Sequence, residues 1–250
     1  MEVLVTGAAS DLGQQLAAVL GREHRVRLFD ERQFPVPARA DSRQGSLLAA
    51  EDVWQAVRGV QAVVHTAVPP AGVPAAGLGR EQALLEWYAR GTHVLMQACV
   101  DAGVRRCVYL STLELFRAYP DDVYISEQWR PLPPPQMEIL GPYLGELVCR
   151  EFAADYRIGV TVLRLGRLEY EETVAPDAPD LLWLDPRDAA QACALALRAD
   201  LSQEVHSARR WRVLHICAQH PDGKYLIQRA REIGYAPVHN YAAVWGGERG

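Results

Sequence analysis

The sequence predicts an α/β fold: a doubly wound parallel sheet with a small C-terminal lobe. Two features of the chain predict it. Short apolar or β-branched runs, typical of strands, alternate with longer segments whose apolar residues recur at helical spacing. In addition, a turn rich in small residues joins the first strand-like run to the first helical segment. Because strands that alternate with helices pair in parallel, the chain is expected to form one sheet with helices on both faces.

The pattern assigns strands and helices along the whole chain. The strands are expected at residues 2–6, 25–29, 61–66, 106–111, 160–163 and 211–216. The helices are expected at residues 12–20, 50–57, 83–100, 143–156 and 186–197. Residues 1–165 then form the nucleotide-binding domain, and residues 166–250 form a small cap that completes the sheet without folding independently. The glycine-rich end, residues 246–250, is expected to fray.

Two proline-rich regions interrupt this alternation. They lie within residues 68–80, after a predicted strand, and within residues 117–141, before a predicted helix. Proline clusters of this kind are typical of loops. Because ligands of doubly wound sheets bind beyond the carboxyl ends of the strands, both loops are expected to wall a substrate cleft.

Charge and hydropathy exclude several classes of partner. The chain has 250 residues and a formal net charge of −5, so it has no general attraction to nucleic acid or to an anionic membrane surface. Charged or amide residues interrupt every apolar run, so no membrane span is expected. The first predicted strand begins at residue 2, which leaves no room for a secretory leader ahead of it. A cytoplasmic location is therefore expected.

The five cysteines argue against disulfide bonds and against a metal site. They are odd in number, widely spaced and embedded in apolar runs, without a C-x-x-C pair. We expect reduced thiols in the core. No set of ligands at workable spacing suggests a metal centre.

The turn after the first strand has the composition of a phosphate-binding turn. Small residues allow the backbone to approach a pyrophosphate, and the helix that follows presents free N–H groups and the positive end of its dipole. In the usual spacing of three glycines, the middle position is Ser10 here. The residues expected to contact the cofactor in this turn are Gly7, Ala9, Ser10, Asp11, Leu12 and Gly13.

Asp30 strengthens this interpretation. It ends the second predicted strand, 17 residues after Gly13, where a carboxylate can accept hydrogen bonds from both ribose hydroxyls of NAD. The same carboxylate would repel the 2′-phosphate of NADP. Asp30 therefore favours NAD, while Arg32 keeps NADP as the alternative. The N-terminal unit is predicted to be of the Rossmann type.

Further motifs follow in a recognisable order. They are Gly45-Ser46-Leu47, Val63-Val64-His65-Thr66-Ala67, Arg90-Gly91-Thr92, Tyr109 to Phe116, Leu163-Arg164-Leu165-Gly166 and Trp183 to Ala190. With the glycine turn and Asp30, they resemble the extended short-chain dehydrogenase/reductase superfamily, in particular its NAD-dependent epimerase/dehydratase family. The resemblance covers most of the chain. One departure is Tyr88, which stands where the family has an asparagine, three residues before Gly91.

The resemblance implies further cofactor contacts. Ser46 and Leu47 match the positions beside the adenine, and His65, Thr66 and Ala67 match the turn on the nicotinamide side. His65 is expected to play a structural part there, contacting the backbone near the cofactor.

The catalytic pair of the family is Tyr-x-x-x-Lys on a helix. Tyr143 matches the tyrosine, which also contacts the cofactor in the family, and Glu151 keeps the register, but Leu147 replaces the lysine. A tyrosine with an ordinary pKa near 10 is phenolate in about one molecule in a thousand at pH 7, a shortfall of roughly 4 kcal/mol. Leu147 can neither lower that pKa nor bind the nicotinamide ribose.

Two more residues match catalytic positions of the family. Thr112 matches the Ser/Thr that binds the substrate oxygen, with a strand-end cap as the alternative role, and Glu114 matches a dehydratase acid/base, with a solvated carboxylate as the alternative. Arg167 and the run Arg209-Arg210-Trp211-Arg212 are candidate anion anchors. Lys224, the only lysine, is expected to face solvent.

Two functions remain open at this point. In the first, the chain is an NAD-dependent oxidoreductase or epimerase for a sugar or nucleotide-sugar hydroxyl or carbonyl, with Thr112 orienting the oxygen and Tyr143 moving the proton. A sugar acid is among the expected substrates. In the second, the chain binds the dinucleotide without catalysis, as a redox sensor or scaffold, because the lysine is missing. A homodimer is compatible with both functions.

Overall fold

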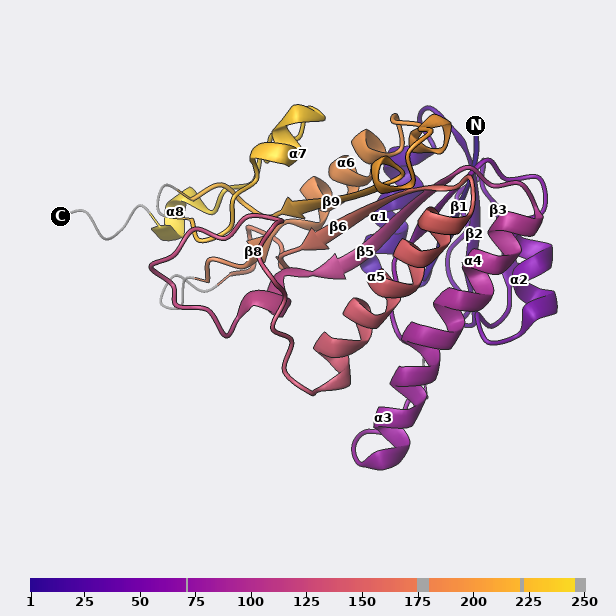
Figure 1. Cartoon of the computed structure of the whole chain (residues 1–250), viewed down its shortest axis with the longest axis horizontal. Helices are drawn as coiled ribbons and strands as arrows, with labels where there is room; N and C mark the ends of the chain where they lie inside the picture. Colours follow the sequence, from indigo (N-terminus) through magenta and orange to yellow (C-terminus); the bar gives the residue numbers. More distant parts are fainter. Residues whose placement is uncertain (71, 175–179, 221–222, 246–250) are drawn as a thin grey trace.

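The computed structural model contains the predicted parallel sheet (Figure 1). It describes residues 1–70, 72–174, 180–220 and 223–245. All paired strands of the main sheet run parallel, in the order β3-β2-β1-β4-β5-β6-β9. Their bounds are β1 Glu2–Thr6, β2 Arg25–Asp30, β3 Asp41–Gln44, β4 Ala62–His65, β5 Arg106–Thr112, β6 Gly159–Leu165 and β9 Trp211–Ile216. The order reverses between β1 and β4, so the predicted doubly wound fold is confirmed.

Helices cover both faces of this sheet. On one face α1, Asp11–Leu20, packs against α6, Pro186–Ala196. On the other face α2, Ala50–Val57, packs against α4, Thr92–Asp101, and α4 packs against α5, Met137–Asp155. Figure 1 shows α4 and α5 running side by side across the sheet. A segment of π-helix, Glu86–Gly91, joins α3, Leu78–Leu85, to α4 without a break.

Several elements differ from the prediction; the helix expected from residue 83, for example, begins with α3 at Leu78. β3 has the sequence Asp-Ser-Arg-Gln, and its polar composition hides it from a search for apolar runs, although it pairs along β2 at the sheet edge. Helix α5 begins at Met137, six residues before the predicted start at Tyr143, and it contains Pro142. A proline inside a helix loses one backbone hydrogen bond, so the sequence there is typical of a break.

Residues beyond 165 contribute to the same sheet. β9 pairs along the whole of β6 and forms its far edge. A small second sheet joins β7, Arg167–Leu168, to β8, Trp183–Leu184. The short helices α7, Gln228–Glu232, and α8, Ala242–Trp245, follow β9. The division at residue 165 stays a prediction, and the expected fraying of residues 246–250 lies outside the described residues.

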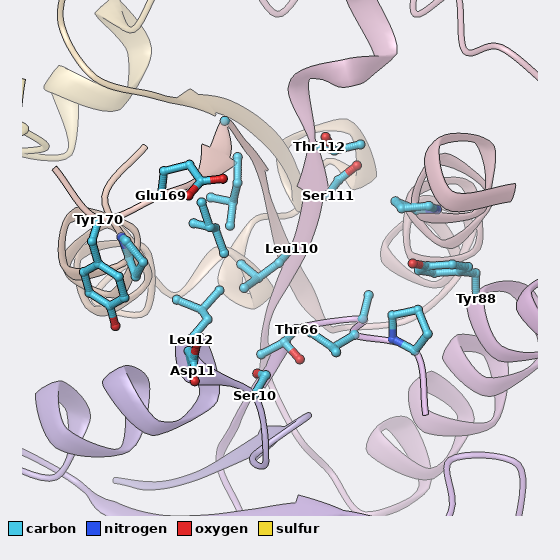
Figure 2. A pocket seen from close by; sticks show the side chains of 18 residues that line it. Ser10, Asp11, Leu12, Thr66, Tyr88, Leu110, Ser111, Thr112, Glu169 and Tyr170 are labelled. Carbon is cyan, nitrogen blue, oxygen red and sulfur yellow. The ribbon is translucent and has the colours of Figure 1, made fainter. Parts of the chain in front are cut away.

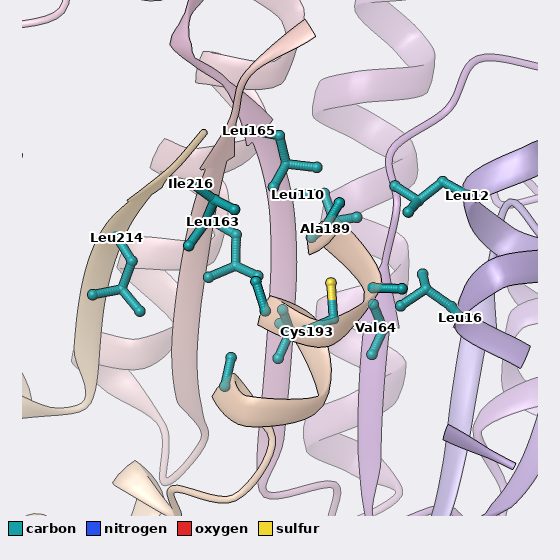
Figure 3. Close-up of a cluster of buried hydrophobic side chains, with 14 of the residues drawn as sticks. Leu12, Leu16, Val64, Leu110, Leu163, Leu165, Ala189, Cys193, Leu214 and Ile216 are labelled. Carbon is teal, nitrogen blue, oxygen red and sulfur yellow. The ribbon is translucent and has the colours of Figure 1, made fainter. Parts of the chain in front are cut away.

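The core has a layer on each face of the sheet. Figure 3 shows part of the layer beneath α1 and α6, where Leu12 and Leu16 meet Val64 and Leu110. The opposite layer joins the other strand faces to α2, α4 and α5. All five cysteines are buried in these layers as free thiols, as expected. Strands buried on both faces explain why their sequences are almost continuously apolar.

A polar row crosses the buried sheet beside the core. Ser111, Arg164 and His215 are register neighbours on β5, β6 and β9. His215 is fully buried, and both of its ring nitrogens lack a hydrogen-bond partner among the described residues. Burial and the charge of Arg164 lower the pKa of His215 to about 3. The native state therefore holds a neutral imidazole at a position where protonation is costly.

Acidification is expected to destabilise the fold through His215. An unfolded histidine titrates near pH 6.5, so from there downwards the unfolded chain binds a proton that the native state does not bind. The free energy of unfolding then falls by about 1.4 kcal/mol per pH unit from this residue. In urea titrations, His215→Leu should shrink the stability difference between pH 7 and pH 5 by about 2 kcal/mol. His206→Leu, at an exposed position, is the control; equal slopes in all three proteins would contradict the prediction.

Candidate functional site

The turn between β1 and α1 is shaped by two glycines. Gly7 has a φ of +67°, and a Cβ there would overlap the Thr66 hydroxyl. A Cβ on Gly13 would overlap the Gly7 carbonyl oxygen, so the start of α1 lies against the turn. Ser10, at the middle glycine position, folds back: its hydroxyl donates to the Gly7 carbonyl at 2.7 Å and accepts from the Gly13 N–H at 3.1 Å. Ser10 therefore caps α1, and the other N–H groups of the first turn have no acceptor within the helix.

Asp30 lies beside this turn at the end of β2. Its carboxylate accepts from the Ala9 N–H at 3.0 Å, from the Arg32 N–H at 2.9 Å and from the Arg32 guanidinium at 3.1 and 3.2 Å. Burial acts to raise the pKa of Asp30, but the hydrogen bonds from Arg32 and Ala9 outweigh it and hold the pKa below its usual range. Asp30 is thus an ionised acceptor at neutral pH. Arg32 forms an ion pair with this carboxylate at 3.1 Å.

A small cavity of about 10 Å³ lies beside Asp30. Its described lining residues are Gly7, Phe29, Asp30, Glu31, Gly45, Leu47, Val68, Pro69, Pro70 and Trp87. Leu47, predicted beside the adenine, is in this lining. Ser46 is not: its N–H donates to Asp52 at 3.0 Å and its hydroxyl accepts from the Leu48 N–H at 3.3 Å. Ser46 thus holds the turn rather than facing the cavity.

A second cavity of about 460 Å³ opens at the carboxyl ends of the strands (Figure 2). Its described lining residues are Ser10, Asp11, Leu12, Thr66, Ala67, Val68, Pro69, Tyr88, Leu110, Ser111, Thr112, Pro142, Leu165, Gly166, Leu168, Glu169, Tyr170 and Pro186. Val68 and Pro69 line both cavities, so the two adjoin. Together they pass from Asp30, across the start of α1, to Thr112. The predicted loop at 68–80 thus walls the site, whereas the loop at 117–141 adds no residue to the described lining of either cavity.

The family follows from a direct comparison. The model of the NAD dependent epimerase/dehydratase family matches residues 3–177. This chain belongs to that family. The match confirms the resemblance drawn from the glycine turn, Asp30 and the order of the later motifs. It places the two adjoining cavities in an epimerase/dehydratase fold.

Similar proteins include dehydrogenases and an epimerase. An NAD-dependent glucose-6-phosphate dehydrogenase of Haloferax volcanii is 27% identical over 269 aligned residues, covering 96% of this chain and 94% of that protein. A glucuronic acid dehydrogenase from Chromohalobacter salexigens superposes with a TM-score of 0.80 at 19% identity, over 98% of this chain and 87% of that one. For UDP-glucuronic acid 4-epimerase from Bacillus cereus the TM-score is 0.73 at 17% identity, over 98% and 99%. The two structural likenesses show a shared fold.

His65, the last residue of β4, and the two residues after it match the nicotinamide-side turn of the family. Thr66 and Ala67 line the larger cavity, and Ala67 adopts a left-handed φ of +55°. His65 lies behind them, with Nδ1 hydrogen-bonded to the Thr6 hydroxyl at 2.7 Å and Nε2 to the Thr92 hydroxyl at 3.2 Å. Complete burial lowers the pKa of His65 to about 3. His65 thus ties β1 to α4 as a neutral imidazole and lines neither cavity.

Tyr88 presents its phenol to the larger cavity. It lies in the π-helix, its ring is almost fully buried, and Figure 2 shows its hydroxyl directed into the cavity. A Cβ at Gly141 would overlap this ring, so α5 can pass only because that residue is glycine. Within the described chain the hydroxyl has no hydrogen-bond partner, and burial raises the pKa of Tyr88. In the sequence, Tyr88 stood out only as a departure from the family's asparagine. Its place in a π-helical segment is a second signal, because such segments are often found at functional sites.

Helix α5 presents Pro142, rather than Tyr143, to the cavity. Tyr143 is half-buried and packs against the core cluster that also contains the cavity-lining residues Leu110 and Leu165. Within the described part of the chain, its hydroxyl makes no hydrogen bond. The acid that anchors α5 is Glu146, which accepts from Arg164 at 2.9 and 2.7 Å, while Glu151 is 66% exposed. Glu151 is exposed on α5, and the part given to Tyr143 at the site stays a prediction.

Thr112 and Glu114 have separate environments. Thr112 lines the cavity, and its hydroxyl also accepts from the Glu114 N–H at 3.1 Å, which leaves its proton free to donate. The Glu114 carboxylate pairs with Arg167 at 2.6 Å and with Arg117 at 3.3 Å, and Glu114 is absent from the described lining. Thr112 is thus in place to bind a ligand oxygen, whereas Glu114 is held in ion pairs beside the site.

The other basic candidates are engaged in the fold. Arg167 pairs with Asp180 as well as Glu114, and Arg210 is buried with its guanidinium on the carbonyls of residues 153 and 154. Lys224 is 2% exposed and donates to the Tyr119 carbonyl and to Asp121. The prediction that Lys224 faces solvent was wrong, because its ammonium group binds these oxygens and lies 5.8 Å from the centre of the buried Tyr225 ring.

The described residues contain neither a metal site nor a membrane-spanning helix. Across residues 1–245 without the gaps at 71, 175–179 and 221–222, no group of three His, Cys, Asp or Glu side chains is placed to hold a metal ion. In the same residues, no helix has the length and apolar character that crossing a membrane requires.

The Glu146–Arg164 pair is expected to be the anchor of α5. Both side chains are buried, so Glu146→Gln leaves an unpaired guanidinium and should cost about 3–5 kcal/mol of unfolding free energy. Glu151→Gln, at the exposed position, should cost less than about 0.5 kcal/mol. Urea unfolding of both variants checks this, and replacing both partners by Met should recover most of the loss. A smaller loss for Glu146→Gln than for Glu151→Gln would contradict the assignment.

Proposed function

We propose that this chain is an NAD-dependent oxidoreductase acting on a hydroxyl or carbonyl group of a molecule about the size of a sugar. The observation that carries the proposal is the pair of adjoining cavities. They lead from an ionised acceptor at Asp30, past the N-terminus of α1, to the hydroxyls of Thr112 and Tyr88. A dinucleotide needs these features in this order: an acceptor for its ribose, N–H groups for its pyrophosphate and room for its reactive ring.

Different residues of the chain bind the cofactor and the substrate. Asp30 accepts from the ribose hydroxyls once Arg32 turns aside, and the α1 N-terminus binds the pyrophosphate beside Ser10. NAD, when bound, supplies the hydride acceptor or donor. Thr112 donates its remaining proton to the reacting oxygen of the substrate. The size of the cavity and the sugar dehydrogenases among the similar proteins support a sugar as the substrate.

Proton transfer is the step of the reaction for which the described lining offers the fewest suitable side chains. Tyr88 directs a phenol into the cavity, but its raised pKa keeps it protonated, so it serves as a hydrogen-bond donor to the substrate. Tyr143 as the proton carrier stays a prediction, because Tyr143 is absent from the described lining of the cavity. Glu114 as an acid/base also stays a prediction and requires release from Arg167.

A second candidate function is cofactor binding without turnover, as a redox sensor or scaffold. The observation in its favour is Pro142, which occupies the cavity-facing position of α5 and can neither donate nor accept a proton through its side chain. Both candidates require the dinucleotide to bind. They differ in whether any substrate is oxidised.

Binding of NAD is expected to depend on Asp30. Calorimetric titration with NAD, NADH, NADP and NADPH should show NAD or NADH binding in the micromolar range, weakened about 10- to 100-fold by Asp30→Ala, because hydrogen bonds to a charged acceptor are lost. Asp101→Ala, an exposed acid at the end of α4, is the matched control and should bind as wild type does. No binding by any of the four dinucleotides would overturn the proposed function and the second candidate together.

The two phenols are expected to contribute unequally to turnover. In NADH-formation assays over a panel of aldoses and cyclic alcohols, Tyr88→Phe should lower kcat/KM about tenfold, the worth of one hydrogen bond to the reacting oxygen. Tyr143→Phe is the matched variant. If it abolishes turnover while Tyr88→Phe does not, Tyr143 is the proton carrier and the role given to Tyr88 is wrong. No turnover by wild type on the panel, with NAD binding intact, would favour the second candidate.

A further inference from the structure

The described lining of the larger cavity contains carboxylates and no cation. Among its described lining residues, the charged ones are Asp11, at the start of α1, and Glu169. Figure 2 shows the Glu169 side chain extending toward the cavity from the side opposite Tyr88. Within the described residues the Glu169 carboxylate has no ion-pair partner. Neither arginine nor lysine appears in the described lining, so an anionic ligand would find no countercharge there.

The arginines nearest in sequence to the lining are already paired. Arg167 binds Glu114 and Asp180, both at 2.6 Å. Arg187, next to the lining residue Pro186, binds Asp185 at 2.6 Å and Glu172 at 2.8 Å. Recruiting either guanidinium for a substrate would leave carboxylates unpaired, including that of Asp185, whose side chain is fully buried.

Arg164 is unsuited to the task for a different reason. It lies one residue before the lining residue Leu165, and its bidentate bond to Glu146 holds the guanidinium against α5. Its remaining Nη1 is buried without a partner in the described chain, and Arg164 is not part of the described lining. This guanidinium therefore does not reach a ligand in the cavity.

The rest of the substrate end is apolar or carries neutral hydroxyls. Leu110, Leu165, Leu168, Pro142 and Pro186 supply apolar surface. Such surface suits the face of a ring or a hydrocarbon group. The neutral donors are the hydroxyls of Tyr88, Ser111, Thr112 and Tyr170.

We infer that the site takes an uncharged alcohol or carbonyl compound with an apolar side, and discriminates against sugar acids and sugar phosphates. The inference rests on the proposed function and names the substrate class of the same site. A carboxylate or phosphate group would lose its hydration in an apolar cavity without a cation, and Glu169 would repel it. A neutral hydroxyl or carbonyl finds donors and is not repelled. Discrimination here comes from the cost imposed on the charged competitor.

Matched probes test the inference on protein saturated with NADH, which places no positive charge on the nicotinamide ring. The probes are glucuronate and its methyl ester, equal in ring structure and different in charge, with cyclohexanone as an apolar carbonyl compound. Calorimetry should show the ester binding at least tenfold more tightly than glucuronate. Glu169→Gln should narrow this ratio and Glu169→Arg should narrow it further or reverse it. Glu151→Gln, an exposed acid on α5 outside the described lining, should leave it unchanged.

The outcomes separate this inference from the proposed function. Failure of NADH to bind is a failure of the proposed function. With NADH bound, tighter or equal binding of glucuronate in the wild type overturns the inference alone. Absence of binding by both the ester and cyclohexanone overturns it as well. A ratio that Glu169→Arg does not change would show that Glu169 has no part in the discrimination.

Discussion

The buried ion pair between Glu146 and Arg164 determines how helix α5 meets the site. Arg164 lies near the carboxyl end of β6, and its bidentate bond to Glu146 sets the rotation of the helix. One turn before Glu146, on the same side of α5, lies Pro142, which therefore reaches the cavity. Gly141 leaves room for Tyr88, whereas Tyr143 packs on the core cluster and is absent from the described lining. A single pair of charges thus decides which side chains of α5 the ligand can meet.

Much of the fold could be predicted because the central strands are buried on both faces. Their apolar runs stand out in the sequence, as residues 2–6 and 106–111 illustrate. β3 could not be found this way, since a solvent-facing edge strand has no apolar pattern. The start of α5 was hidden by Pro142, which breaks the local signal of helix although the tertiary structure tolerates it.

The cofactor end of the site was more predictable than the substrate end for a physical reason. The glycine turn and Asp30 depend on local geometry, because the turn must pass close to a pyrophosphate whatever the rest of the chain does. The substrate end depends on helix rotation, and one residue changes the direction of a side chain by about 100°. Tyr143 and Pro142 are adjacent in sequence yet face different surroundings. Which of the two faces the cavity depends on Arg164, the partner of Glu146, which lies on β6.

The burial of all five cysteines has a practical consequence. Burial raises the pKa of the thiols of Cys99, Cys149, Cys193 and Cys217, so they are protonated as well as inaccessible in the native protein. Alkylating reagents attack thiolates and need access to them. The native chain is therefore silent toward such reagents until it opens, and the rate of modification reports that opening. A cysteine introduced at an exposed position would then carry a probe alone, without removal of any native residue.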